Sequence, residues 1–337
     1  MNISRRDFVK QAGLASVAVP AAVQAQNAST GQAKDTINPL PIRVGMTDWN
    51  LGQRGDITKI ALAREIGLDG IQVSVQYPTD GKPTLRDPKT QAAFKRAALE
   101  NGIQICSLAI GNPGKSRMPM HTSPAFAILL AEAVEIAYNI GTNNILLPIL
   151  GDSHIDMTNQ AQVDTFVAMM KEVARYAEKY EVVVGLEDWI SAQDNIKLLD
   201  AIGSDYVAVY YDAHNIVSRI NTDIYAEPKL LGKRISQIHV KNANMLLETP
   251  GGKMDWPRMA KEFYDIGYRG WYVLETGSPT KDIVADTRAN VAYVKKNFPR
   301  PPGLRSDRSL SGARESTYPT PLAGYGKPVG GAIAGSR

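Results

Sequence analysis

Short apolar runs alternate with longer amphipathic stretches through the middle of the chain. The short runs are rich in β-branched residues and have the length of strands, at 42–49, 70–77, 103–110, 144–150, 182–189, 207–214, 235–242 and 270–276. Between them apolar positions recur with helical spacing, as in 57–67, 88–102, 123–141 and 162–180. Several helical stretches end in glycine just before the next strand, at Gly67, Gly102 and Gly141, which is a common helix stop.

Eight repeats of strand and helix predict an α/β fold, a single-domain (β/α)8 TIM barrel over residues 42–298. Strands that alternate with helices pair in parallel, and eight such repeats have the size of a closed barrel. The alternative is an open, doubly wound sheet. Its dinucleotide-binding signal, GxGxxG directly after the first strand, does not follow residues 42–49. The closed barrel is therefore the prediction.

Residues 1–25 predict a twin-arginine export signal. The sequence SRRDFVK is followed by a short Ala-, Val- and Gly-rich core and by AVQA, whose small residues a signal peptidase accepts. An amphipathic N-terminal helix is the ordinary alternative, and the apolar stretch falls short of the roughly 20 residues of a membrane span. We therefore expect a linker at 26–41 and a protein that is periplasmic or otherwise exported.

Residues 299–337 are rich in Pro, Gly, Ser and Arg, which predicts a flexible tail or an arm lying on a neighbour. Residues 1–25 carry a net charge of +2 and residues 299–337 carry +4, so the rest of a chain whose total is +4 carries −2. The predicted barrel thus has no positive excess that would favour nucleic acid. The single cysteine, Cys106, excludes an intrachain disulfide, and its apolar surroundings indicate a buried structural thiol.

Charged residues end the last four predicted strands, and the chemistry of such barrels lies at the carboxyl ends of the strands. The fifth strand ends with Glu187, the sixth with Asp212, the seventh with His239 and Lys241, and the eighth with Glu275. Because residues two apart share a face of a strand, His239 and Lys241 point the same way. Other polar residues at strand ends are Asp48, Asn50, Asp152, His154 and Asp188.

A metal site is favoured by four of these residues, Glu187, Asp212, His239 and Glu275, on adjacent strands. Any one of them alone is more typical of a salt bridge at the barrel rim. Three converging carboxylates would repel one another, and a divalent cation removes that repulsion. An oxygen-rich set with one imidazole suits Mn²⁺ first, with Mg²⁺, Co²⁺ and Zn²⁺ as alternatives.

The chain resembles the xylose isomerase-like barrels known as sugar phosphate isomerases/epimerases in four segments that occur in order on the fifth to eighth predicted strands: GLEDW, YYDAHN, QIHVKN and YVLET. That family includes ketose 3-epimerases, hydroxypyruvate isomerases and inosose dehydratases, with AP endonucleases as more distant relatives. The resemblance covers about 42–298. It implies that Glu187, Asp212, His239 and Glu275 are metal ligands and that the two glutamates also form an acid/base pair.

The mechanism implied by this resemblance is proton transfer through an enediolate, with the metal on two adjacent sugar oxygens. One glutamate removes a carbon-bound proton and the other returns it from the opposite face. Lys241 either holds a substrate oxygen or pairs with a rim carboxylate. Trp49 and Trp189 are candidates for an apolar wall against the sugar ring, and Trp189 is the better one. Trp271, at the start of its strand, fits barrel packing instead.

Two departures from the family pattern bear on function. Many relatives have a histidine three residues after the strand-six aspartate, whereas this chain has Asn215 there and His214 one residue earlier. We expect His214, Asn215 and His154 near the substrate. The chain has only four histidines, which argues against the three-metal AP endonucleases. Residues 251–253, Gly-Gly-Lys, are a weak phosphate-binding signal, so a free or glycosidic sugar is favoured over a sugar phosphate.

The leading hypothesis is a divalent-metal-dependent sugar isomerase or epimerase acting on a small carbohydrate. A lyase is the second hypothesis, because removal of the C2 proton of a 3-keto-glycoside can expel the C1 substituent. A non-catalytic sugar-binding barrel is the third, and it predicts that some of the four candidate ligands are lost. We expect no nucleic-acid partner and no membrane attachment after signal cleavage. Association into homo-oligomers is common among such barrels, and the sequence leaves it open here.

Overall fold

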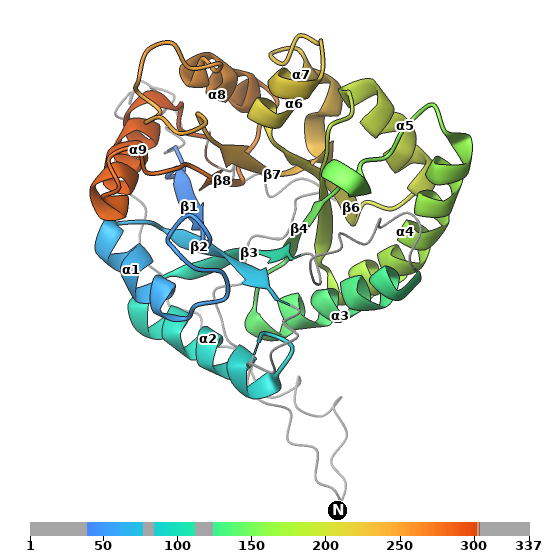
Figure 1. Ribbon diagram of the computed structural model, residues 1–337, viewed down its shortest axis with the longest axis horizontal. Coiled ribbons are helices and arrows are strands. Elements are labelled where there is room, and N and C mark those ends of the chain that lie inside the picture. The colour runs from blue at the N-terminus through green and yellow to red at the C-terminus, as the bar shows by residue number, and fades with distance from the viewer. Residues whose placement is uncertain (1–38, 77–83, 112–123, 302, 304–337) are drawn as a thin grey trace, which may run out of the picture. The chain divides into compact units, whose positions relative to one another are not determined.

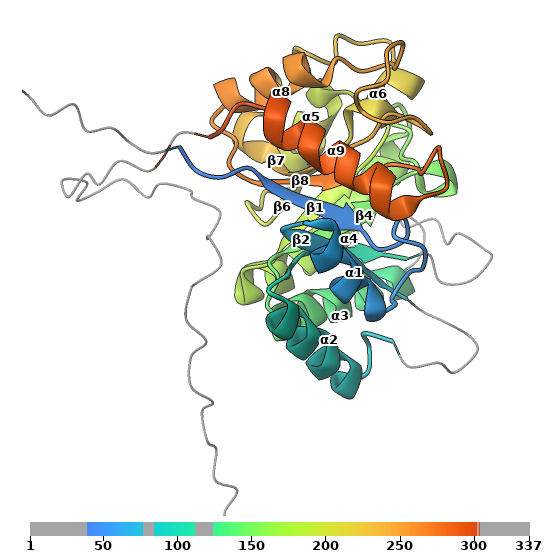
Figure 2. The ribbon, with the colours of Figure 1, turned by 90° about the vertical axis from the view of Figure 1, so that its left-hand side faces the viewer.

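The barrel consists of eight parallel strands that close on themselves in sequence order (Figure 1). The computed structural model describes residues 39–76, 84–111, 124–301 and 303. Its strands are β1 (Arg43–Thr47), β2 (Gly70–Val75), β3 (Gln104–Ile110), β4 (Asn144–Pro148), β5 (Val183–Glu187), β6 (Val207–Tyr211), β7 (Ile235–Val240) and β8 (Trp271–Leu274). β1 pairs with β8, which closes the barrel (Figure 2). The predicted (β/α)8 fold is confirmed.

Helices surround the strands and make the crossovers that parallel pairing requires (Figure 1). They are α1 (Thr58–Ile66), α2 (Pro88–Asn101), α3 (Pro124–Ile140), α4 (Gln160–Tyr180), α5 (Ala192–Ile202), α6 (Ala213–Arg219), α7 (Glu227–Leu231), α8 (Trp256–Asp265) and α9 (Ile283–Asn297), with short 3₁₀ turns at Gly151–Ser153 and Gly232–Arg234. The predicted glycine stops hold: Gly67 and Gly102 have φ of 92° and 62°, in the left-handed region that ends a helix without Cβ strain.

Apolar side chains fill the space between strands and helices, and a smaller cluster fills the barrel interior. The interior cluster consists of Cys106, Ala109, Leu146, Tyr210, Trp271 and Val273. Trp271 therefore packs inside the barrel, as expected. Cys106 is buried, and burial raises the pKa of its thiol to about 12. A thiol held protonated in this way is a poor nucleophile. The prediction that Cys106 is buried is confirmed.

Seven of the eight strands end two or three residues earlier at the rim than the apolar pattern predicted, and β3 ends at Ile110 as predicted. β6 stops at Tyr211, because the Asp212 carboxylate accepts a hydrogen bond from the Asn215 backbone N–H at 3.0 Å and caps helix α6. The predicted strand 207–214 is therefore three residues too long, since His214 lies in the first turn of that helix. An N-cap aspartate looks the same in sequence as one that ends a strand.

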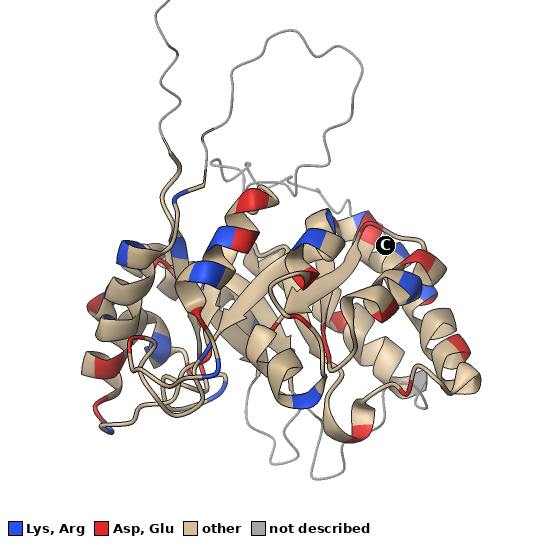
Figure 3. Cartoon of the chain, turned by 90° about the horizontal axis from the view of Figure 1, so that it is seen from above, with Lys and Arg blue, Asp and Glu red and all other residues tan. Residues whose placement is uncertain are grey.

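The export signal and most of the tail, predicted at 1–25 and 299–337, lie outside the described residues. Within the described part, no helix is both long enough and apolar enough to cross a membrane. Lysine and arginine are interspersed with aspartate and glutamate over the outer helices (Figure 3). This mixture agrees with the small net charge calculated for the barrel segment.

Candidate metal centre and active site

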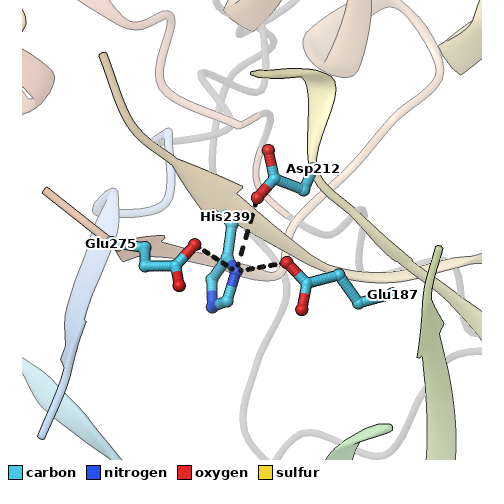
Figure 4. A group of neighbouring side chains, drawn as sticks. All are labelled: Glu187, Asp212, His239 and Glu275. Atoms are coloured by element: carbon cyan, nitrogen blue, oxygen red, sulfur yellow. Dashed lines mark hydrogen bonds and ion pairs between the residues drawn. The ribbon is translucent and has the colours of Figure 1, made fainter. Parts of the chain in front are cut away.

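Four side chains from the last four strands converge at the carboxyl ends of the barrel strands (Figure 4). Glu187 is the last residue of β5, Asp212 directly follows β6, His239 lies in β7, and Glu275 directly follows β8. One ligand atom of each lies within 4.8 Å of those of the others. Three of the side chains are buried, and Glu275 is partly exposed. The structure thus brings together all four residues that the sequence singled out as metal ligands.

The imidazole of His239 lies at the centre of this group. Its Nδ1 lies 3.2 Å from Glu187 Oε1, 3.4 Å from Glu275 Oε2 and 3.7 Å from Asp212 Oδ2. The two glutamates approach from opposite sides of the ring (Figure 4). One nitrogen and three carboxylate oxygens from different strands therefore surround a common point.

Lys241 completes the cluster from the outer end of β7. Its Nζ lies 2.6 Å from Asp212 Oδ2 and 2.7 Å from Glu275 Oε2. His239 and Lys241 reach the same carboxylates, as the two-residue period of a strand predicts. Of the two roles considered for Lys241, the geometry shows the pairing with rim carboxylates.

The carboxylates stabilise positive charge at the centre of the cluster. Burial would lower the pKa of His239, but Glu275, Asp212 and Glu187 raise it to about 10. Burial would likewise raise the pKa of Asp212, but Lys241 and His239 hold it below its ordinary value. Burial raises the pKa of Glu187 to about 7, with the neighbouring carboxylates adding to the rise. Charges of both signs are thus confined in a space that water scarcely reaches.

This donor set fits a divalent cation. Three carboxylate oxygens and one imidazole nitrogen form the hard, mostly oxygen set that Mn²⁺, Mg²⁺ and Co²⁺ accept and that Zn²⁺ tolerates. Their mutual distances, all within 4.8 Å, permit one ion to reach all four. Without a cation the three carboxylates rely on Lys241 and His239 for compensation.

A buried polar group behind His239 was not singled out from the sequence. Gln72, in β2, meets His239 Nε2 through its amide oxygen at 3.1 Å. Its amide nitrogen donates to Ser107 Oγ at 2.9 Å and to the Tyr210 hydroxyl at 3.0 Å. The available signal was a polar residue at an inward position of the apolar strand GIQVSV.

Two further residues bind the carboxylates of the glutamates. The Asn215 side chain donates to Glu187 Oε1 at 3.0 Å, so the position where many relatives have histidine does lie at the cluster. Trp49 Nε1 donates to Glu275 Oε1 at 3.3 Å. Each hydrogen bond restrains the orientation of a carboxylate. Trp49 does so from the loop after β1, the strand that pairs with β8.

Trp189 and His154 form a separate group on the rim, their rings 6.0 Å apart. The guanidinium of Arg219 lies over Trp189, 4.4 Å from the ring centre. His214 is half-buried in α6, and its Nε2 is buried with no hydrogen-bond partner within the described ranges. His214 interacts electrostatically with Asp212 and Glu275 of the cluster. The roles of His214, His154 and Trp189 in substrate binding stay predictions.

Two other rim carboxylates have structural partners instead. Asp48 accepts hydrogen bonds from the backbone N–H groups of Gly55 and Ser74, at 2.7 and 2.8 Å, and so holds the loop after β1. Asp188 accepts from the Ile190 N–H, at 3.0 Å, on the side of the strand opposite to Glu187. Rim position alone therefore did not identify the site.

Comparison with known proteins agrees with this fold. The family model for the xylose isomerase-like TIM barrel matches residues 60–297. Among solved structures, a xylose isomerase domain protein from Planctomyces limnophilus is 16% identical with a TM-score of 0.62, covering 77% of this chain and 96% of that one. A 3-keto-D-glucoside 4-epimerase from E. coli is 13% identical with a TM-score of 0.62, covering 75% and 99%. A D-psicose 3-epimerase from Clostridium cellulolyticum H10 is 16% identical with a TM-score of 0.62, covering 76% and 99%. No curated protein matches the chain.

Proposed function

The chain belongs to the xylose isomerase-like TIM barrel family, and from that premise we propose that it is a divalent-metal-dependent sugar isomerase or epimerase acting on a free or glycosidic sugar. The observation that carries the proposal is the convergence of two glutamates, an aspartate and a histidine at one point of the rim. Several solved structures of this fold are sugar epimerases, which supports the same class of substrate.

The residues that would hold the ion are Glu187, Asp212, His239 and Glu275, with Mn²⁺ as the first choice. When bound, a divalent cation would polarise the substrate carbonyl and stabilise the negative charge of an enediolate. Lys241, paired with Asp212 and Glu275, adds a second positive charge at the outer edge of the same group.

Glu187 and Glu275 are the proposed acid and base. They come from strands on either side of β6 and β7 and lie on opposite sides of the His239 ring (Figure 4). A carbon-bound proton can therefore leave to one carboxylate and be replaced from the other, which inverts the carbon. Asn215 and Trp49 each hold Oε1 of one carboxylate, and Lys241 donates to Oε2 of Glu275.

A lyase acting on 3-keto-glycosides is the second candidate, favoured by a structural relative that is a 3-keto-D-glucoside epimerase. In this reaction a glutamate takes the C2 proton, and the C2–H electrons form a C1–C2 double bond. The C1–O bond breaks, and the departing alkoxide takes a proton to leave as an alcohol. Both reactions begin with the same proton removal, so the same residues serve either.

Incubation in D₂O separates these functions. The Mn²⁺-loaded protein is mixed with ketohexoses and with 3-keto-glucosides, and the products are followed by NMR. An epimerase yields the epimer with deuterium at the inverted carbon, and a lyase releases the alcohol. If neither product formed and the sugar still bound, the non-catalytic sugar-binding barrel would be the remaining hypothesis. Samples stripped with a chelator test the metal dependence.

We further propose that residues 1–25 direct export by the twin-arginine pathway, on the basis of the sequence SRRDFVK. The test is a double substitution of Arg5 and Arg6 by lysine in the full chain. Precursor should then accumulate in the cytoplasm of a bacterial host, while the unaltered chain yields a shorter, exported product. Equal export of both would contradict the proposal.

A further inference from the structure

We propose that Gln72 is the positioning residue that makes His239 a metal ligand, by fixing which ring nitrogen carries the hydrogen. The inference rests on the metal site of the proposed function and adds a residue from the opposite half of the barrel. His239 can bind a cation only through a nitrogen without hydrogen, and the nitrogen that faces the carboxylates is Nδ1. The hydrogen must therefore lie on Nε2.

The contacts of Gln72 match that arrangement. Its amide oxygen lies 3.1 Å from His239 Nε2, in a position to accept the Nε2 hydrogen. Its two amide hydrogens are taken by Ser107 Oγ at 2.9 Å and by the Tyr210 hydroxyl at 3.0 Å. With the amide reversed, an N–H would face Nε2, the ring hydrogen would move to Nδ1, and cation binding at Nδ1 would be lost.

All four members of this chain of hydrogen bonds are fully buried, so water cannot replace a missing partner. The relative exposure is 0% for each of Gln72, Ser107, Tyr210 and His239. The Tyr210 ring also packs edge-on against the His239 ring, with centroids 4.7 Å apart. The four residues come from β2, β3, β6 and β7, so the barrel itself sets their spacing. Partners of this kind typically change metal affinity about 10–100-fold.

The barrel offers a matched control in Gln237. This second glutamine is buried in the interior, two residues before His239, and its amide nitrogen donates to the Cys106 carbonyl oxygen at 2.7 Å. Among the described hydrogen bonds, none joins Gln237 to His239. Replacing Gln237 by methionine therefore removes a buried amide of the same size without touching the imidazole.

The test compares Gln72→Met, Gln72→Glu and Gln237→Met with the unaltered protein, measuring Mn²⁺ affinity by calorimetry and stability by urea unfolding. Gln72→Met should weaken Mn²⁺ binding about 10–100-fold. Gln72→Glu keeps an acceptor for Nε2, and the Ser107 and Tyr210 hydroxyls can turn to donate to it, so its affinity should stay within a few-fold. Gln237→Met should lose stability without losing affinity. Equal Mn²⁺ affinity in Gln72→Met and the unaltered protein would overturn the proposal.

A second measurement does not depend on any variant folding. Long-range ¹H–¹⁵N correlation spectra of the unaltered, Zn²⁺-loaded protein report which nitrogen of His239 carries hydrogen. Hydrogen on Nε2 supports the proposal and hydrogen on Nδ1 refutes it. If the unaltered protein bound no divalent metal at all, the proposed function would fail. If it bound metal and Gln72→Met bound it equally well, only the role of Gln72 would fail.

Discussion

The two halves of the barrel contribute different kinds of side chain to the same site. The half from β5 to β8 supplies its charged groups: Glu187, Asp212, His239, Lys241 and Glu275. In the described part of the other half, the groups that touch this cluster are neutral. Gln72 binds His239, and Trp49 binds Glu275.

This division separates charge from orientation. A neutral amide acceptor or indole donor orients a charged neighbour without adding to or cancelling its charge. The negative charge of the carboxylates is therefore retained for the proposed cation and proton transfer. Asp48, a carboxylate in the first half, differs from these residues because it accepts hydrogen bonds from the backbone N–H groups of Gly55 and Ser74.

The largest expected effect follows from removing an acid or base in the charged half. Glu187→Gln and Glu275→Gln should each lower the turnover number about 10²–10⁴-fold, because a neutral amide cannot accept or return the proton. Turnover is measured on NMR-identified substrate at saturating Mn²⁺, with metal content checked in the same samples. Asp188→Asn, which changes a carboxylate on the other face of the strand, is the control and should keep most of the activity. Full turnover in both glutamine variants would contradict the proposed roles.

Lys241→Met tests how much the positive charge of Lys241 stabilises the carboxylates of the charged half. Removing Lys241 leaves Asp212 and Glu275 with His239 as their remaining positive partner, which should lower the free energy of unfolding of metal-free protein by about 3 kcal/mol. Mn²⁺ should restore most of this loss, because it binds the same oxygens. Urea unfolding with and without Mn²⁺ is the measurement. Lys241→Arg, which keeps the charge, serves as the control, and a loss that Mn²⁺ does not reduce would contradict a shared site.

Asp48→Asn asks whether a rim carboxylate in the first half is structural only. Both backbone N–H groups donate to the same oxygen, Oδ2, and a neutral amide oxygen accepts them more weakly than a carboxylate does, so the free energy of unfolding should fall by about 2 kcal/mol. Mn²⁺ affinity, measured by calorimetry, should not change. A parallel loss of affinity would show that the two halves are not divided as described.

Trp49→Phe gives the smallest expected effect. It removes one hydrogen bond to Glu275 Oε1, at 3.3 Å, and keeps an aromatic ring in place. We expect a loss of about 1 kcal/mol in transition-state stabilisation, seen as a severalfold drop in kcat/KM. Trp271→Phe, a change in the interior cluster, should leave kcat/KM unaltered while it lowers stability. A drop larger than that of Glu275→Gln would mean that Trp49 does more than orient the carboxylate.

The periodic pattern of the sequence was enough to predict the barrel. The charged residues at the ends of the predicted strands were enough to predict which half of the barrel carries the charged cluster. Burial imposes alternation on strands and helical spacing on helices, so eight repeats could be recognised before any contact was known. The segments around Glu187, Asp212, His239 and Glu275 are local as well, because each lies at the end of its own strand. The predicted strands extended too far at their carboxyl ends. In β6 this happened because the sequence does not distinguish a helix-capping aspartate, Asp212, from the last residue of a strand.

Tertiary structure alone decided which side chains meet. Gln72 and His239 are 167 residues apart, and Trp49 and Glu275 are 226 apart, so no local pattern connects them. Their contacts arise from closure and register of the barrel, which bring β2 against β7 across the interior and the loop after β1 against the end of β8. The sequence by itself determined which residues are available at the rim, because that follows from periodicity. The closed barrel determined which of them converge at one point, which orient these side chains and which, like Asp48, hold a neighbouring loop instead.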